Sequence, residues 1–345
     1  MKIYYLPFDL ELKHEFKISY HSRKSTPTVL IRVEQEGIFG YGEASLPPYL
    51  PENTSAVIDF LKKLTINDIY SFEDLKKVLV EIDLLEDGNS AAKAAVDIAL
   101  HDLLGKILKK SCRDFYGINN TSLPSTSFTI GLDDDDVIKE KILEADSFQI
   151  LKIKLGTQRD KEIIKKIRTY TDKPLYIDAN QAWNDVTYAL EMIEWLSMQN
   201  VILVEQPVSK NNLDGAAFLK ENSPLPIIAD EAFQRFADLK NIQHAYSGIN
   251  IKLMKCAGIH EAFKIIDQAE EYNLKLMMGC MTETSCGISA AIQLASLIDY
   301  ADLDGNLLIN NDPFFAKTVK DGRLLYPEGF GIGIKPKGEL AYIEL

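Results

Sequence analysis

Tyr-Ile-Asp-Ala-Asn at residues 176–180 is the first of three similar segments in which a short apolar run leads into an acid, here Asp178. The other two are Leu-Val-Glu-Gln-Pro at 203–207 and Ile-Ala-Asp-Glu at 228–231. Runs that carry lysines flank the three, with Leu-Lys-Ile-Lys at 151–154 before them and Asn-Ile-Lys at 250–252 after them. Charged groups rarely lie beside such apolar runs unless they are paired, bound to a metal or catalytic. These runs are therefore candidates for a functional site.

The charged positions of these runs recur at a near-constant spacing. Asp178 and Glu205 are 27 residues apart, Glu205 and Asp230 are 25 apart, and Asp230 and Lys252 are 22 apart. One strand followed by one helix takes about this many residues, so each charge is predicted to lie at the same point of successive strand–helix units.

The same alternation continues on both sides of these runs. Beyond about residue 126, β-like runs separated by amphipathic helical stretches lie near 127–131, 150–155, 175–179, 201–205, 226–229, 249–253, 275–279 and 302. Strand–helix alternation implies parallel strands with right-handed crossovers, and eight units imply a (β/α)8-type barrel. The last unit is degenerate, because Asp302-Leu303-Asp304 is followed by loop-like sequence.

The residues before the barrel have a different pattern. Segments 16–20 and 28–33 are rich in β-forming residues, and a loop is expected between them at 21–27. Residues 53–110 are predicted to be helical, with Ser90 capping the clearest helix.

A chain of 345 residues exceeds the usual size of a single core, so two domains are expected. We expect an α+β domain at residues 1–122 and the barrel at 123–317. The residues from 318 to 345 are again rich in β and turn formers, and are expected to return to the first domain.

Composition narrows the function classes. The chain is 46% hydrophobic and 26% charged, as is typical of a soluble globular protein. A net charge of −13 argues against nucleic acid or an anionic membrane as a partner. The sequence lacks a long apolar segment and a signal peptide, and its four cysteines have no metal-type spacing. We therefore expect a reduced, cytoplasmic protein with free thiols.

Asp178, Glu205 and Asp230 are predicted to converge at the barrel mouth, because the C-terminal ends of the strands form the active site of such barrels. A single acid would most simply be a helix cap or an ion-pair partner. Three carboxylates from successive strands repel one another unless a cation lies between them. An all-oxygen donor set favours Mg²⁺, for which Mn²⁺ can substitute.

Lys154 and Lys252, on the second and sixth strands, are predicted to face each other across this metal site. Lys152 shares a face with Lys154, and Asn180 shares one with Asp178, because residues i and i+2 of a strand point the same way. A protonated lysine is a poor base, so we expect the metal, the second ammonium and partial burial to lower its pKa. Two lysines on opposite sides of one carbon favour a reaction that inverts a stereocentre.

Together these motifs resemble the muconate lactonizing enzyme subgroup of the enolase superfamily. The resemblance covers essentially the whole chain. It implies an α/β fold, a (β/α)7β modified TIM barrel with an N-terminal α+β capping domain completed by the C-terminal tail. It also implies one Mg²⁺ per subunit, an ene-diolate formed by loss of an α-proton, and a homo-oligomer.

Asp302 and Asp304 resemble a pair that holds the α-ammonium of the substrate in the dipeptide epimerases of that subgroup. Two carboxylates suit a primary ammonium, because each accepts charge-assisted hydrogen bonds. The resemblance implies an isomerase that inverts the α-carbon of the C-terminal residue of an Ala-Xaa dipeptide, such as Ala-Ala, Ala-Glu or Ala-hydrophobic. In this 1,1-proton transfer Lys154 serves the D-configured centre and Lys252 the L-configured centre.

Three alternatives stay open. Two are other activities on the same scaffold, o-succinylbenzoate synthase and N-acylamino acid racemase. The third, more remote, is a metabolite-binding protein without catalysis.

Further substrate contacts are implied by the same resemblance. Lys152 is expected to donate to the substrate carboxylate, and Asn180 to be a further substrate-binding residue. Cys280 is expected to offer its amide rather than its thiol, and Ser127 stands on the first strand where the epimerases often have Thr. Arg23 either binds an acidic side chain of the substrate or is a solvated surface charge, so Ala-Glu-like and Ala-hydrophobic substrates both stay open.

Overall fold

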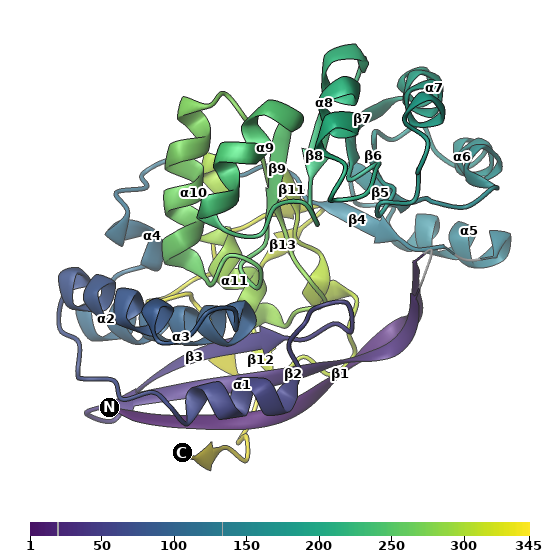
Figure 1. Ribbon diagram of the computed structural model, residues 1–345. Helices are drawn as coiled ribbons and strands as arrows, with labels where there is room; N and C mark the ends of the chain where they lie inside the picture. Colours follow the sequence, from purple (N-terminus) through teal and green to yellow (C-terminus); the bar gives the residue numbers. More distant parts are fainter. Residues whose placement is uncertain (19–20, 133) are drawn as a thin grey trace.

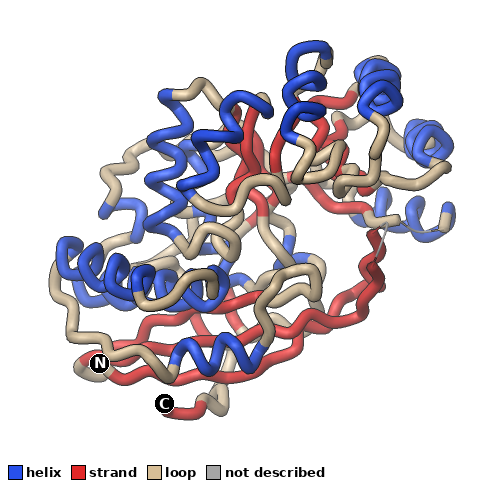
Figure 2. The backbone as a smooth tube through the Cα atoms, viewed as in Figure 1, coloured by secondary structure: helices blue, strands red, loops and turns tan. Residues whose placement is uncertain are grey.

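The structure, a computed structural model, describes residues 1–18, 21–132 and 134–345 and has two parts. An antiparallel sheet with its helices comes first in the chain, and a parallel eight-stranded sheet surrounded by helices follows (Figure 1). The two termini lie near each other on the antiparallel sheet (Figures 1 and 2).

The antiparallel sheet has the order β16-β1-β2-β3. Its members are β1 (Lys2–Ile18), β2 (His21–Gln35), β3 (Ile38–Ser45) and, from the C-terminal tail, β16 (Ile343–Glu344). β1 and β2 form one long hairpin, which reaches from the sheet to the barrel near β4 (Figure 1). The prediction of a loop at 21–27 was wrong, because these polar residues are held in a strand by pairing with β1, as in Ser25 opposite Glu11.

Four helices follow β3 in the chain: α1 (Thr54–Leu61), α2 (Phe72–Leu84), α3 (Ser90–Leu108) and α4 (Cys112–Phe115). α1 and α3 pack on this sheet, and α2 and α4 pack on α3. α3 packs directly on β3, where a Cβ on Gly42 would lie 1.9 Å from the carbonyl oxygen of Ala95. Only glycine permits this approach. The prediction of Ser90 as the cap of α3 was wrong: the carboxylate of Glu52 accepts from the backbone N–H of Ala91 at 2.9 Å.

The parallel sheet has the order β11-β10-β9-β8-β7-β6-β5-β4. Its strands are β4 (Ser127–Ile130), β5 (Ile150–Lys154), β6 (Leu175–Asp178), β7 (Val201–Glu205), β8 (Ile227–Ala229), β9 (Gly248–Ile251), β10 (Lys275–Gly279) and β11 (Tyr300–Asp302). A parallel bridge between Thr126 and Ala301 brings the first and last strands together into a nearly closed barrel. All eight predicted strands are confirmed to within a few residues.

A helix follows each strand except the last: α5 (Asp135–Glu144), α6 (Asp160–Arg168), α7 (Val186–Ser197), α8 (Leu213–Asn222), α9 (Leu239–Ala245), α10 (Ile259–Glu271) and α11 (Ser285–Ile292). After β11 only a short 3-10 turn, η3 (Gly305–Leu307), forms. The (β/α)7β architecture that the family resemblance implied, and that the degenerate eighth unit fits, is therefore confirmed.

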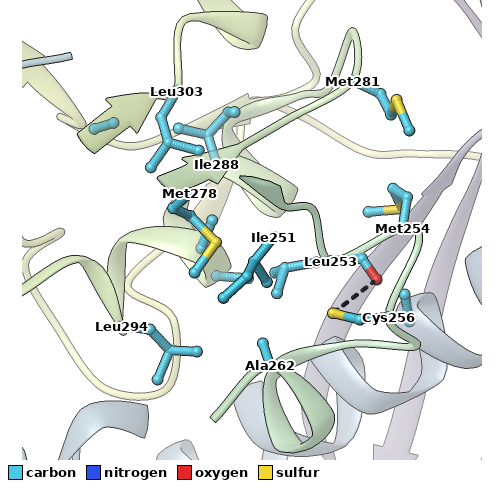
Figure 3. Packing of buried hydrophobic residues seen from close by; sticks show 14 of the residues in the cluster. Ile251, Leu253, Met254, Cys256, Ala262, Met278, Met281, Ile288, Leu294 and Leu303 are labelled. Atoms are coloured by element: carbon cyan, nitrogen blue, oxygen red, sulfur yellow. Dashed lines mark hydrogen bonds between the residues drawn. The ribbon is translucent and has the colours of Figure 1, made fainter. Parts of the chain in front are cut away.

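Apolar side chains of the strands and helices fill the space around the barrel. Figure 3 shows part of this core, with Ile251 and Met278 of neighbouring strands near Ala262 of α10 and Ile288 of α11. All four cysteines are free, and three of them are buried. Within the described residues, no helix is long and apolar enough to cross a membrane.

Two buried acids join the antiparallel part to the barrel. Asp97 of α3 accepts from the backbone N–H of Ile259, at the start of α10, at 2.7 Å. Glu43 of β3 accepts from the backbone N–H of Thr284 at 3.0 Å and of Gly287 at 2.7 Å, at the start of α11. Each acid thus caps a barrel helix from outside the barrel, because its side chain accepts from N–H groups that have no partner within the helix.

Candidate active site

A cavity of about 310 Å³ lies at the C-terminal ends of the barrel strands. Its wall includes residues from the barrel and from the N-terminal part, among them Lys152, Lys154, Lys252, Asp302, Asp304 and Arg23. The charged residues that the sequence singled out are therefore brought to one place, as expected for the mouth of such a barrel.

Asp178, Glu205 and Asp230 form a compact group beside this cavity. Asp178 lies opposite Glu205 in the parallel register of β6 and β7, and Asp230 directly follows β8, the next strand. All three are buried, and one oxygen from each lies within 4.8 Å of the others. Strand register therefore brings Asp178 and Glu205 together, and Asp230, two residues after the register partner of Glu205 on β8, joins them, as their spacing predicted.

The electrostatics of this group fit a bound cation. Burial and the charges of Asp178 and Asp230 raise the pKa of Glu205 to about 7. A cation shared among the three acids would lower this raised pKa, because it stabilises the ionised form of Glu205. The three oxygen donors are of the kind that Mg²⁺ takes, so the residues present fit this metal.

The three lysines predicted from the sequence all contact these acids. The Lys152 ammonium lies 2.7 Å from both Glu205 and Asp302 and 3.2 Å from Asp178. Lys154 donates to Asp178 at 2.5 Å. Lys252, on the other side of the group, donates to Asp230 at 2.7 Å.

The electrostatic surroundings of the lysines differ from the sequence-based expectation. Burial acts to lower the pKa of Lys252, but the charges of Asp230 and Glu205 outweigh it and raise that pKa well above its ordinary value. The pKa of Lys152 is raised in the same way by Asp302, Glu205 and Asp178. Proximity to unneutralised acids is the physical reason, and neutralising those acids with a cation would remove it.

Asp302 and Asp304 lie at the end of β11 and line the same cavity. Besides Lys152, Asp302 accepts from the Ser127 hydroxyl at 2.7 Å. Asp304 accepts from the backbone N–H of Thr129 at 2.6 Å. Ser127 is fully buried behind Asp302, and it is Thr129 that lines the cavity.

Arg23 reaches the cavity from the β1–β2 hairpin and is buried rather than solvated. Its guanidinium donates to the Thr26 and Thr282 hydroxyls, each at 3.0 Å, and lies 5.6 Å from the Tyr49 ring. Cys280 also lines the cavity, and its thiol donates to the carbonyl of Asp302 at 3.3 Å. The Thr26, Thr282 and Tyr49 contacts thus help to hold the Arg23 guanidinium at the cavity wall.

Three further residues of the site escaped the sequence analysis. Asn250 donates to Glu205 at 2.8 Å, and the i, i+2 rule from Lys252 could have found it. Lys255 is buried and donates to Asp230 at 2.6 Å. Lys255 lies beyond the end of β9, so the i, i+2 alternation of strand side chains could not predict that it belongs to the site. Glu231 accepts from Asn180 at 3.3 Å, and both line the cavity.

Comparison with known proteins identifies the family. Residues 5–117 match the family model described as mandelate racemase / muconate lactonizing enzyme, N-terminal domain. Residues 137–340 match the one described as enolase C-terminal domain-like. The chain belongs to the mandelate racemase / muconate lactonizing enzyme family. The resemblance drawn from the sequence motifs is confirmed.

Relatives of this family member carry more specific names. An "L-Ala-D/L-Glu epimerase" of Bacteroides thetaiotaomicron is 48% identical over 97% of this chain and 88% of its own. An "L-Ala-D/L-amino acid epimerase" of Pedosphaera parvula is 36% identical over 98% of this chain and 100% of its own. A solved dipeptide epimerase of Cytophaga hutchinsonii, complexed with Mg and D-Ala-L-Val, superposes with a TM-score of 0.90. It is 27% identical and covers 100% of this chain and 98% of its own.

Proposed function

We propose that this protein is a Mg²⁺-dependent dipeptide epimerase that inverts the α-carbon of the C-terminal residue of an Ala-Xaa dipeptide, with glutamate as the preferred second residue. The observation that carries the proposal is the cavity itself. It combines an acid pair, Asp302 and Asp304, with lysines on either side of a buried carboxylate triad. The names of the relatives agree with this activity.

The acid pair gives the reason for a dipeptide with a free amino end. Both acids are buried, and burial together with the charge of Asp302 raises the pKa of Asp304 to about 7. A primary ammonium between them would satisfy both by charge-assisted hydrogen bonds. N-acylated substrates and succinylbenzoate precursors carry no such ammonium, so they cannot make these charge-assisted bonds to the pair.

The proton transfer is assigned to the two lysines that flank the triad. Lys252 removes the α-proton from an L-configured centre and Lys154 returns a proton to the opposite face, with the roles exchanged for a D-configured centre. The ene-diolate formed between these steps is stabilised by the Lys152 ammonium, which donates to the substrate carboxylate. Mg²⁺ held by Asp178, Glu205 and Asp230 would supply further positive charge against the negative charge that develops there.

The position of Arg23 favours a substrate whose second residue has an acidic side chain. A buried guanidinium at the cavity wall can pair with a side-chain carboxylate, which is its best-matched partner. We therefore favour Ala-Glu over Ala-hydrophobic substrates.

The test is α-proton exchange in D₂O with Mg²⁺ and pools of L,L- and L,D-dipeptides, followed by mass spectrometry. We expect a one-dalton gain in Ala-Xaa dipeptides, largest for Ala-Glu. A metabolite-binding protein without catalysis would give no gain in any substrate. No gain in dipeptides, together with turnover of N-acylamino acids or of a succinylbenzoate precursor, would assign the protein to one of those activities instead.

Asparagine at both acid positions separates the same alternatives. The variant Asp302→Asn/Asp304→Asn should lose about 10- to 100-fold in kcat/KM per acid with dipeptides, because each lost charge-assisted bond contributes about 1.5–3 kcal/mol. Activity on N-acylamino acids would not need the pair and would be spared. Asp59→Asn, at an exposed surface position, is the matched control.

A further inference from the structure

A second cavity, of about 420 Å³, lies next to the reaction cavity and takes no part in the mechanism above. It is bounded by the hairpin at Leu12 to Glu15, by Phe128 of β4, by Phe148, and by Leu307 and Leu308 after β11. Figure 1 shows the hairpin reaching β4 and α5, and residues of all three elements line this cavity. Thr129 and Leu308 line both cavities, so they form the boundary between them.

This boundary coincides with the acid pair. Asp304 accepts from the backbone N–H of Thr129 at 2.6 Å, and the Thr129 hydroxyl is 3.5 Å from Asp302. In a dipeptide the α-carbon of the first residue is bonded directly to the ammonium nitrogen. A dipeptide held by this acid pair therefore has the α-carbon of its first residue close to Thr129, at the boundary with the second cavity.

The lining of the second cavity is mainly apolar. Leu12, Leu307 and the paired rings of Phe128 and Phe148, whose centroids are 5.0 Å apart, contribute its hydrocarbon surface. Charges of both signs lie around it, as in the contact between His14 and Glu144 at 3.1 Å. Such a lining favours a neutral, apolar group over an ion of either sign.

The wall formed by the hairpin is built into the fold. The backbone N–H of Lys13 donates to the carbonyl of Leu308 at 2.9 Å, and that of Asn310 donates to Glu11 at 2.8 Å. Leu12 forms an antiparallel bridge with Ile309 between these bonds. The cavity is thus closed by backbone pairing between the hairpin and the segment that follows the acid pair.

We propose that this second cavity receives the side chain of the first residue of the dipeptide, so that the protein acts on dipeptides that begin with a large apolar residue as well as on those that begin with Ala. The proposal rests on the proposed function, because the acid pair must hold the ammonium. It adds a substrate class: apolar-Glu dipeptides, such as Leu-Glu and Phe-Glu.

The first experiment measures kcat/KM for α-proton exchange with L-Ala-L-Glu, L-Leu-L-Glu and L-Phe-L-Glu on the unmodified protein. We expect the values for Leu-Glu and Phe-Glu to lie within tenfold of that for Ala-Glu. Values more than 100-fold lower, with Ala-Glu turned over normally, overturn the second cavity as a subsite and leave the proposed function standing. No exchange with any dipeptide overturns both.

The second experiment fills the cavity. Leu12→Trp adds a large ring from the hairpin side, and we expect it to lower the ratio of kcat/KM for Phe-Glu to that for Ala-Glu at least tenfold. Leu143→Trp, on the exposed face of α5, adds a comparable volume outside the cavity and should leave the ratio unchanged. An unchanged ratio in a folded Leu12→Trp protein contradicts the proposal.

Discussion

The acids at the barrel mouth and the acids between the antiparallel sheet and the barrel are all buried, but they have different partners. Glu205 and Asp230 lie against lysine ammonium groups, and Asp302 does so as well. Asp97 and Glu43 accept hydrogen bonds from backbone N–H groups at helix starts. Lysine side chains can change partners when a substrate binds, whereas backbone N–H groups stay fixed in their helices. We therefore expect substitutions in the first set of acids to alter activity, and substitutions in the second set to alter the free energy of unfolding.

Removal of the metal should give the largest effect on the first set. Dialysis against a chelator is expected to lower kcat by roughly 10³-fold or more, because the charge lost from the reacting carboxylate contributes about 4 kcal/mol or more. The melting temperature should rise again when Mg²⁺ returns, since the ion binds the folded triad. If chelator-treated protein with no bound metal keeps full activity, the reaction does not need a metal held by the three acids.

Arg23→Gln tests the specificity part of the same region. We expect kcat/KM for Ala-Glu to fall about 10- to 100-fold, as is usual when a charge-assisted bond is lost, while Ala-Leu is turned over at least as well as before. Lys24→Gln changes the neighbouring exposed cation and is the control. Equal losses of kcat/KM for Ala-Glu and Ala-Leu would show that Arg23 stabilises the cavity wall and does not bind the side chain of the second substrate residue.

Asp97→Asn tests the second set. The loss of a buried carboxylate at the start of α10 should lower the free energy of unfolding by about 2 kcal/mol, with kcat nearly unchanged. Asp267→Asn, at an exposed position of the same helix, should change neither quantity. Denaturant unfolding measures the free energy of unfolding of both variants. A large fall in kcat of Asp97→Asn at unchanged stability would contradict the assignment of Asp97 to the structural set of acids.

Glu43→Gln should give the smallest effect, seen as a change in pH dependence. Burial and the neighbouring charge of Glu283 raise the pKa of Glu43 to about 8, and burial raises that of Glu283 to about 7. Because the folded form holds the proton more tightly than the unfolded chain, these groups stabilise the fold at low pH. That stability is lost as the pH rises from about 4.5 to 8.

Melting temperatures with saturating Mg²⁺ between pH 6 and pH 9 would measure this. The unmodified protein should lose up to about 1.4 kcal/mol per pH unit per proton, and Glu43→Gln should flatten the curve. Glu73→Gln, at a mostly exposed position, is the control and should leave the slope unchanged. A slope unaffected by Glu43→Gln would mean that Glu43 is ionised throughout.

The barrel could be predicted from the sequence because its signals are local. Each strand is a short apolar run, and Asp178 and Glu205 mark the same end of consecutive strands. The metal triad follows directly from that register. The missing last helix was also visible, because the residues after Asp304 lack a helical pattern.

The parts that could not be predicted depend on partners distant in the chain. Residues 21–27 are polar and form a strand only because β1 pairs with them. Lys255 belongs to the site because folding brings it to Asp230, 25 residues earlier in the chain. Glu52 replaces Ser90 as the cap of α3 from a loop 39 residues away from Ala91. Propensity and spacing within a single segment carry no information about such contacts.

Lys154 and Lys252 are proposed to act on opposite faces of one α-carbon, and single-lysine variants in D₂O test this most directly. Lys154→Ala should still exchange the α-proton of L-Ala-L-Glu without forming the epimer, and Lys252→Ala should do so only with L-Ala-D-Glu. The unmodified protein should label both. If each variant keeps or loses exchange equally for both epimers, the two lysines do not divide the faces of the substrate between them.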